Sequence, residues 1–145
     1  MGDLSKDINS KFANNRVKAL INILYTANWI TSNQNEFFKN YGISPQQYNI
    51  LRILNGAKEP LNVQVIKDRM IERAPNATRL MDKLCAKKLI DRLPCPGDRR
   101  VVKIVITNEG EKLLASIPDD FNKQLLKNLS EEDAEKLSNL LDKMR

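Results

Sequence analysis

The strongest constraint on the fold of this chain is a change in hydrophobic period near Leu89. Before this point, apolar residues recur at three- and four-residue steps, which is the spacing of one face of an α-helix. After it, residues 89–93 and 101–106 form two runs rich in apolar and β-branched side chains, which favour strands. Residues 94–100 are rich in proline, glycine and polar side chains, as turns are. The sequence therefore predicts a β-hairpin directly after a helical region, with residues 94–100 as its tip.

Two short helices are predicted immediately before the hairpin. Asn62 can cap a helix that runs to Met70, because its side chain can accept a backbone N–H of the first turn. Pro75 favours the first turn of the next helix, and a turn at about residues 72–74 separates the two. Two helices that are joined by a short turn and followed by a hairpin make a winged helix-turn-helix.

Longer helical segments flank this lobe. Residues 7–41 and 121–145 each carry apolar residues at helical spacing. Ser44 and Gln47 have the spacing of a capping box, which predicts that another helix begins there, and Thr107 can cap the helix after the hairpin.

The expected architecture is a mainly α chain of the α+β class, folded as a single domain over residues 1–145. Residues 44–117 form the winged helix-turn-helix lobe. The apolar stripes of residues 7–41 and 121–145 are too long for a lobe of this size to cover, so these segments are predicted to be dimerisation helices that a second copy buries.

Positive charge is concentrated in the winged lobe. The chain carries 24 Lys and Arg against 18 Asp and Glu, a net charge of +6. Residues 67–103 hold eleven basic and five acidic side chains, an excess equal to that of the whole chain, whereas residues 104–145 are net acidic. Because Lys and Arg that neutralise phosphates drive binding to nucleic acid, we expect a phosphate-binding face in the middle segment.

The composition argues against an enzyme. The chain has no histidine, which removes Ser-His and Cys-His catalysis and nearly every ordinary zinc or copper site. Its five glycines are scattered and form no phosphate-binding loop. We therefore expect no catalytic residue, no metal and no cofactor. Two cysteines are too few for a disulfide framework, and neither a membrane span nor a signal peptide is evident, so we expect a cytoplasmic protein.

The helix that starts near Pro75 is the candidate recognition helix. Asn76, Thr78 and Arg79 lie in its N-terminal part, which meets base edges in the major groove. Arginine can pair with guanine and asparagine with adenine, while threonine can contact the thymine methyl group. Lys83 is expected to meet phosphate rather than bases. The alternative is a solvated helix face on which Asn76 and Thr78 act only as near-cap residues.

Arg99 and Arg100, at the predicted tip, are the second candidate DNA contact. Arginines on a short ribbon can enter a minor groove, where the negative potential attracts them. Asp98 would be misplaced on a surface that faces DNA, so we expect it to aim an arginine through a charge-assisted hydrogen bond. The alternative is an ordinary polar hairpin turn.

Four short motifs follow one another along the chain: ISPQQYNIL at residues 43–51, ATRLMDKL at 77–84, DRR at 98–100 and ITNEG at 106–110. Together they resemble the MarR family of bacterial transcriptional regulators, over most of the chain from about residue 10. The resemblance implies a homodimeric repressor whose terminal helices intertwine and whose two winged lobes bind a palindromic operator in double-stranded DNA.

The same resemblance implies roles for single residues. Arg100 would be the minor-groove arginine and Asp98 its orienting partner. The chain departs from the family pattern at Lys88, where the family usually has glycine, and at the proline-flanked residues 94–96.

A pocket between the dimerisation helices and the winged lobe is also implied by the resemblance. Tyr25, Trp29, Tyr41 and Tyr48 come from the helices that would line it, with Phe37 and Phe38 near them in sequence. A small aromatic effector is expected there. The alternative is that these aromatic side chains are ordinary core.

Cys85 and Cys95 are the two candidates for redox control. Cys85 falls on the apolar side of the recognition helix, which favours a core role. Cys95 lies in the predicted tip, and the arginines near it in sequence favour a thiolate. The redox-sensing members of the family carry their reactive cysteine near the N-terminus, where this chain has none, so a redox sensor is the disfavoured interpretation.

The alternative function is a winged-helix module that binds proteins and not DNA. Such a module does not need Arg79, Arg99 and Arg100 together, so these arginines favour DNA binding.

Overall fold

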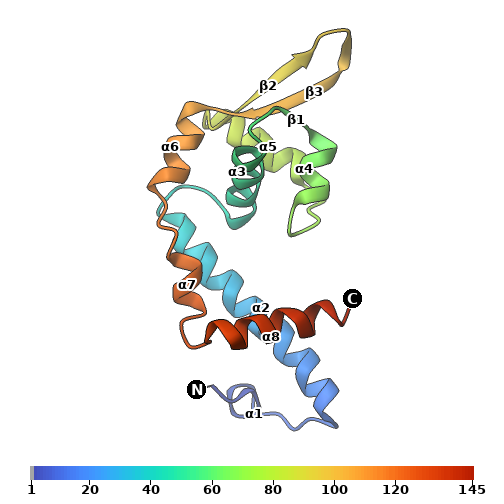
Figure 1. Cartoon of the computed structure of the whole chain (residues 1–145), viewed down its shortest axis with the longest axis vertical. Coiled ribbons are helices and arrows are strands. Elements are labelled where there is room, and N and C mark those ends of the chain that lie inside the picture. Colours follow the sequence, from blue (N-terminus) through green and yellow to red (C-terminus); the bar gives the residue numbers. More distant parts are fainter. Residues whose placement is uncertain (1) are drawn as a thin grey trace. The chain divides into compact units, whose positions relative to one another are not determined.

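The computed structural model of the chain describes residues 2–145, apart from the side chain of Arg99. The fold is mostly helical, with a three-stranded antiparallel sheet in the order β1-β3-β2 (Figure 1). The chain divides into two compact units, the first ending at Ala115 and the second spanning Ser116–Arg145. No helix of the described residues is long and apolar enough to cross a membrane.

The winged lobe lies in the first unit and has the predicted order of elements. It is made of α3 (Pro45–Ala57), β1 (Leu61–Asn62), α4 (Val63–Arg69), α5 (Ala77–Ala86), β2 (Ile90–Cys95), β3 (Asp98–Ile106) and α6 (Asn108–Ser116). The structure therefore confirms the winged helix-turn-helix architecture. The short strand β1 was not predicted; it pairs Leu61 with Ile104 and Asn62 with Lys103 of β3.

The core of the lobe draws side chains from nearly every element, with three of the largest from α3. Its largest fully buried side chains are Ile50, Leu51, Leu54, Ile66, Met81, Leu84, Ile90 and Ile104. Burial of each such aliphatic side chain stabilises the fold by about 1.5–3 kcal/mol relative to exposure. The helices α3, α4 and α5 are thus held against the base of the hairpin by one shared core.

The predicted helix starts of the lobe are correct in their chemistry. At α3, Ser44 N–H donates to Gln47 Oε1 (3.0 Å) and Gln47 N–H donates to Ser44 Oγ (3.1 Å), which completes the capping box. At α4, Asn62 Oδ1 accepts the backbone N–H of Val65 at 2.8 Å. Gln47 also reaches the carbonyl of Leu80 in α5 (3.5 Å), so one side chain caps a helix and links it to the next.

The long N-terminal helix is shorter than predicted. Residues 7–41 were expected to be one helix, but the structure has a single turn, α1 (Leu4–Asp7), and then α2 (Asn15–Lys39). The reason is local: Asn9 adopts a left-handed conformation (φ 49°), and the side chain of Asn14 accepts the N–H of Val17 at 3.0 Å, which begins the helix.

The tip of the hairpin is also shorter than predicted. Cys95 pairs with Asp98, so Pro96 and Gly97 alone connect the two strands, and Gly97 has the positive φ (99°) that such tight turns require. Asp98, Arg99 and Arg100 therefore belong to β3 and not to a loop. The strand pattern extends into residues 94–100 because the tertiary fold supplies a partner strand for polar residues that sequence alone favours in turns.

The second unit contains α7 (Phe121–Leu125) and α8 (Glu131–Asp142). Ser130 caps α8 by accepting the N–H of Asp133 at 3.1 Å. The Ser130 hydroxyl donates a hydrogen bond to the Asp133 carboxylate (2.8 Å). In a full capping box this carboxylate would accept the backbone N–H of Ser130.

The two ends of the hairpin meet at a crowded junction. Thr107 Oγ1 donates to the carbonyl of Lys88 (2.7 Å) and accepts the N–H of Gly110 (3.1 Å), which caps α6. A Cβ at Gly110 would lie 2.3 Å from the carbonyl oxygen of Leu89 and 2.7 Å from Ile106 Cγ1. Lys88 itself has φ 59°, the conformation that favours the glycine it replaces in the family pattern.

Substitution Gly110→Ala is expected to lower the free energy of unfolding by about 1–3 kcal/mol, because the added methyl group meets backbone that cannot move aside easily. Urea denaturation followed by circular dichroism measures the change.

The matched control is Gly56→Ala, since Gly56 lies within α3 and a Cβ there has no neighbour within 4 Å. It is expected to raise the free energy of unfolding by about 0.5–1 kcal/mol. Equal stability of the two variants would contradict the close approach at Gly110.

Candidate nucleic-acid interface

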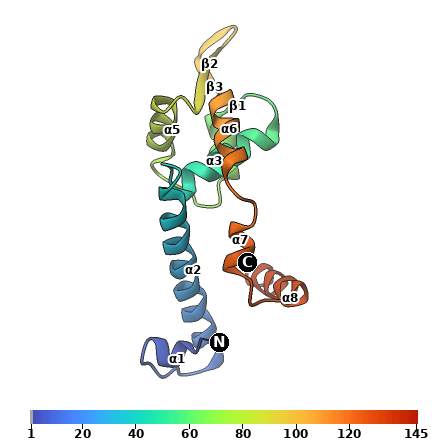
Figure 2. The same cartoon turned by 90° about the vertical axis from the view of Figure 1, so that its left-hand side faces the viewer.

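One side of α5 is buried and the other is open. Ala77, Met81 and Leu84 face the core of the lobe and are at most 1% exposed. The side chains that the sequence singled out on this helix are all exposed: Asn76, Thr78, Arg79 and Lys83. Figure 2 shows α5 at the edge of the lobe, next to the base of the hairpin.

Three of these side chains form a row along the exposed side of α5. Asn76, Arg79 and Lys83 are spaced by three and four residues, which places them on one face of the helix, over about two turns. Asn76 occupies the N-cap position but makes no side-chain capping hydrogen bond. Its carboxamide is therefore not used as a helix cap.

The turn between α4 and α5 is held by two contacts that the sequence did not reveal. Ile71 N–H donates to Asn49 Oδ1 at 3.0 Å, and Gln46 Nε2 donates to Glu72 Oε2 at 2.9 Å. Asn49 and Gln46 belong to α3, more than twenty residues away in sequence, so no local pattern could identify these pairs. Their effect is to position the turn that precedes α5.

The hairpin of β2 and β3 projects beyond the helices of the lobe (Figure 1). Arg100 is exposed near its tip. Asp98 Oδ1 accepts the backbone N–H of Arg100 at 2.9 Å. The contact recorded between these two residues thus shapes the backbone at the tip and does not involve the guanidinium. The side chain of Arg99, a predicted DNA contact, lies outside the described part of the structure.

An ion pair joins α5 to the wing. Arg92 on β2 donates to Asp82 on α5, and both side chains are about half exposed. The hydrogen bond that Arg92 donates to the Asp82 carboxylate raises the pKa of Arg92 above its ordinary value. Surface pairs contribute little to stability, about 0–1 kcal/mol, so the main effect is to fix α5 relative to the base of the hairpin.

Both cysteines are half-buried. Burial raises the pKa of the Cys85 thiol above its ordinary value, although Arg92 opposes this by favouring the thiolate. The structure therefore places Arg92 beside Cys85 and Asp82, whereas its sequence position suggested Cys95. Within residues 2–145, no group of three or more His, Cys, Asp or Glu side chains is arranged to hold a metal ion.

The four aromatic residues predicted to line an effector pocket fall into two separate places. Tyr48 packs on Phe38 (ring centroids 4.5 Å) and Tyr41 on Phe37 (5.4 Å), near the end of α2. Tyr25 and Trp29 lie earlier on α2, and Trp29 is eight residues, about 12 Å along the helix axis, before Phe37. They line a hollow of about 430 Å³ with Leu4, Asp7 and neighbours from the N-terminal segment. The structure thus brings together two pairs rather than one set of four.

Several known proteins resemble this chain in sequence and in fold. Residues 41–101 match the MarR family. The HTH-type transcriptional regulator MhqR of Bacillus subtilis is 31% identical over 79% of this chain and 81% of its own length. A MarR transcription factor from Planctomyces limnophilus has 29% identity and a TM-score of 0.70, with 91% of this chain and 98% of that one covered. The MepR–DNA complex of S. aureus has 25% identity and a TM-score of 0.74, and the match covers 92% of this chain and 97% of that chain.

The raised pKa of Cys85 predicts its reactivity. In a Cys95→Ser variant, alkylation of Cys85 by iodoacetamide should begin at higher pH than in the urea-unfolded chain, because the thiolate is the reactive form. Arg92→Gln should move the pH profile higher still, since Arg92 lowers this pKa, whereas Arg52→Gln on α3 should leave it unchanged. A folded-state profile at or below that of the unfolded chain would refute the effect of burial.

Proposed function

Because the chain belongs to the MarR family, whose members regulate transcription, we propose that it is a homodimeric repressor that binds a palindromic operator in double-stranded DNA. The proposal rests chiefly on one observation, the exposed row of Asn76, Arg79 and Lys83 on a helix whose other side is buried. Repression follows from occupation of the operator, and the site of action is the cytoplasm.

The row on α5 suits the major groove. Arg79 can donate two hydrogen bonds to guanine, and the carboxamide of Asn76 can donate to and accept from adenine. Thr78 lies beside them and can contact a thymine methyl group, while Lys83, one turn further along, is suited to phosphate. The positive excess of residues 67–103 supplies the attraction to phosphates that precedes any reading of bases.

The wing supplies the second contact in this proposal. Arg100 and Arg99 would enter the minor groove beside the half-site that α5 occupies. Asp98 contributes by its hydrogen bond to the Arg100 backbone, which holds the tip in one conformation. The S. aureus relative MepR, of similar fold, is known in complex with DNA, which supports this mode of binding.

The homodimer is supported by apolar side chains that the chain leaves exposed. On α2 these are Val17, Leu20, Leu24, Tyr25 and Trp29; in the second unit they are Leu126, Leu129, Leu137, Leu140 and Met144. Large exposed apolar patches of soluble proteins mark interaction sites. A second copy would cover them symmetrically, and its twofold axis would match a palindromic operator.

A small aromatic effector completes the proposal. The exposed rings of Tyr25 (42%) and Trp29 (46%) offer stacking surfaces beside a hollow on α2. A ligand that binds there would act where the proposed dimer contact lies. A panel of phenolic acids tests this part of the proposal. If no phenolic acid shifts either the melting temperature or the affinity for the operator, the effector is contradicted.

DNA binding is tested by fluorescence anisotropy with DNA from upstream of the gene. Arg79→Ala is expected to weaken binding by about 1–3 kcal/mol, and Lys83→Ala to reduce the slope of log affinity against log salt by about 1. Arg145→Ala, an exposed arginine of the acidic segment, is the control and should change neither. Absence of DNA binding would favour the protein-interaction alternative, and an affinity that does not respond to salt would contradict the phosphate contacts.

The homodimer is tested by light scattering at micromolar concentration, which should give twice the chain mass of 16.6 kDa. Leu24→Glu places a charge on the exposed apolar side of α2 and should shift the mass towards the monomer. Ile71→Glu is the matched control, because Ile71 is 88% exposed but lies on the turn before α5. A monomer mass for the unmodified protein would overturn the dimer.

A further inference from the structure

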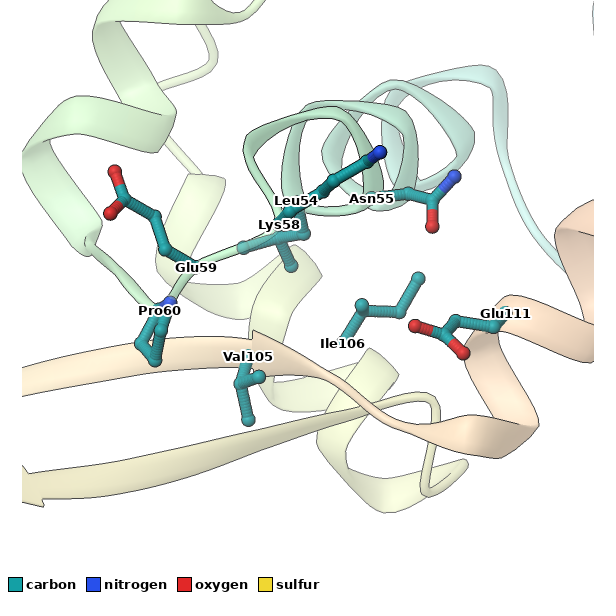
Figure 3. Close-up of a pocket in the computed structure, with 8 residues that line it drawn as sticks. All are labelled: Leu54, Asn55, Lys58, Glu59, Pro60, Val105, Ile106 and Glu111. Atoms are coloured by element: carbon teal, nitrogen blue, oxygen red, sulfur yellow. The ribbon is translucent and has the colours of Figure 1, made fainter.

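A cavity of about 370 Å³ opens on the winged lobe, away from α2 and from the exposed row of α5. It lies between the C-terminal end of α3, the segment before β1, the end of β3 and the first turn of α6 (Figure 3). Leu54, which is 1% exposed, and Ile106 form an apolar base. The volume is within the range of about 300–1,000 Å³ that is usual for small-molecule sites.

Three polar side chains from different elements surround this base. Asn55 and Lys58 come from α3 and its C-cap, and Glu111 comes from the first turn of α6. Figure 3 shows the Glu111 carboxylate and the Asn55 carboxamide directed towards the space above Ile106, whereas the Glu59 carboxylate points away from them. An amide and a carboxylate are thus directed at one cavity, and Lys58, whose side chain extends along α3 in Figure 3, lines the same cavity.

Among the described residues, no hydrogen bond or ion pair is recorded for the side chains of Asn55, Lys58 and Glu111. Glu109, which lies in the same first turn of α6 as Glu111, does have a partner, because it pairs with Lys112 at 3.9 Å. Lys58 and Glu111 carry opposite charges and line the same cavity without closing it. A ligand with a charge of each sign can bridge them.

We propose that this cavity binds a small zwitterion, a molecule with one carboxylate, one ammonium group and a short apolar body, which is the chemistry of an apolar α-amino acid. The ligand carboxylate would accept hydrogen bonds from the Lys58 ammonium and the Asn55 amide, and the ligand ammonium would donate to Glu111. Leu54 and Ile106 would contact the apolar body. The site shares no residue with the proposed DNA interface, so each proposal can fail without the other.

Isothermal titration calorimetry of the full chain tests the ligand chemistry with three probes of similar apolar body. L-Leucine carries both charges, isocaproate only the carboxylate and isoamylamine only the ammonium group. L-Leucine is expected to bind at least roughly tenfold more tightly than either analogue, because each lacks one charge-assisted contact. Absence of L-leucine binding at millimolar concentration, or equal binding of the three probes, would overturn the proposal.

Two variants test the assigned residues, each with a matched control. Glu111→Gln should weaken L-leucine binding roughly tenfold, while Glu109→Gln on the same helix should not. Lys58→Asn should weaken it similarly, since asparagine tolerates the left-handed conformation of Lys58 (φ 55°). Lys88→Asn changes the same residue type in the same conformation (φ 59°) outside the cavity and should bind normally.

A measurement without substitutions keeps the test independent of variant folding. Methyl-labelled protein should show L-leucine-dependent shifts of the Leu54 and Ile106 methyl resonances in nuclear magnetic resonance spectra. Shifts confined to α2, or unchanged Leu54 and Ile106 signals at saturation, would overturn the assignment of this cavity.

Discussion

The wing is placed by one close contact, and both proposed DNA-reading elements depend on it. The backbone of Gly110 lies so near the carbonyl of Leu89 that a Cβ would come within 2.3 Å of that oxygen. Thr107 ties the same place together, donating its hydroxyl to Lys88 and its backbone N–H to Leu89 (3.1 Å). The end of α5, both ends of the hairpin and the start of α6 therefore meet at one rigid junction, so the recognition helix and the wing are presented as a unit.

Electrostatics complement this packing on the exposed side. The pair of Arg92 and Asp82 joins β2 to α5, the helix that carries the exposed row of Asn76, Arg79 and Lys83. Two of the acidic residues in the basic segment 67–103 have such contacts. Asp82 pairs with Arg92, and Asp98 accepts the backbone N–H of Arg100 at the tip of the hairpin. Arg79, Lys83 and Arg100 are exposed. The unpaired charges of Lys58 and Glu111, by contrast, flank a cavity elsewhere on the lobe.

Local sequence was a reliable guide wherever a few neighbouring residues decide the structure. The caps at Ser44 and Asn62 were predicted because each side chain can accept the backbone N–H of the residue three positions later, and the structure has both hydrogen bonds. The prediction was wrong for the start of α2, because an apolar stripe does not reveal that Asn14 begins the helix. It also missed β1, since a two-residue strand is defined only by its partner β3.

The sequence by itself determined the order of elements, the winged lobe and the basic middle segment, because period, capping and charge are properties of short stretches. It also identified Asn76, Thr78, Arg79 and Lys83 as an exposed group. Only the tertiary structure decided which side chains that are distant in sequence lie together: Arg92 pairs with Asp82, the aromatic residues fall in two places, and Lys58 and Glu111 line one cavity. The physical reason is that such side chains come together where separate elements pack on a common core, and a local sequence pattern does not encode how those elements pack.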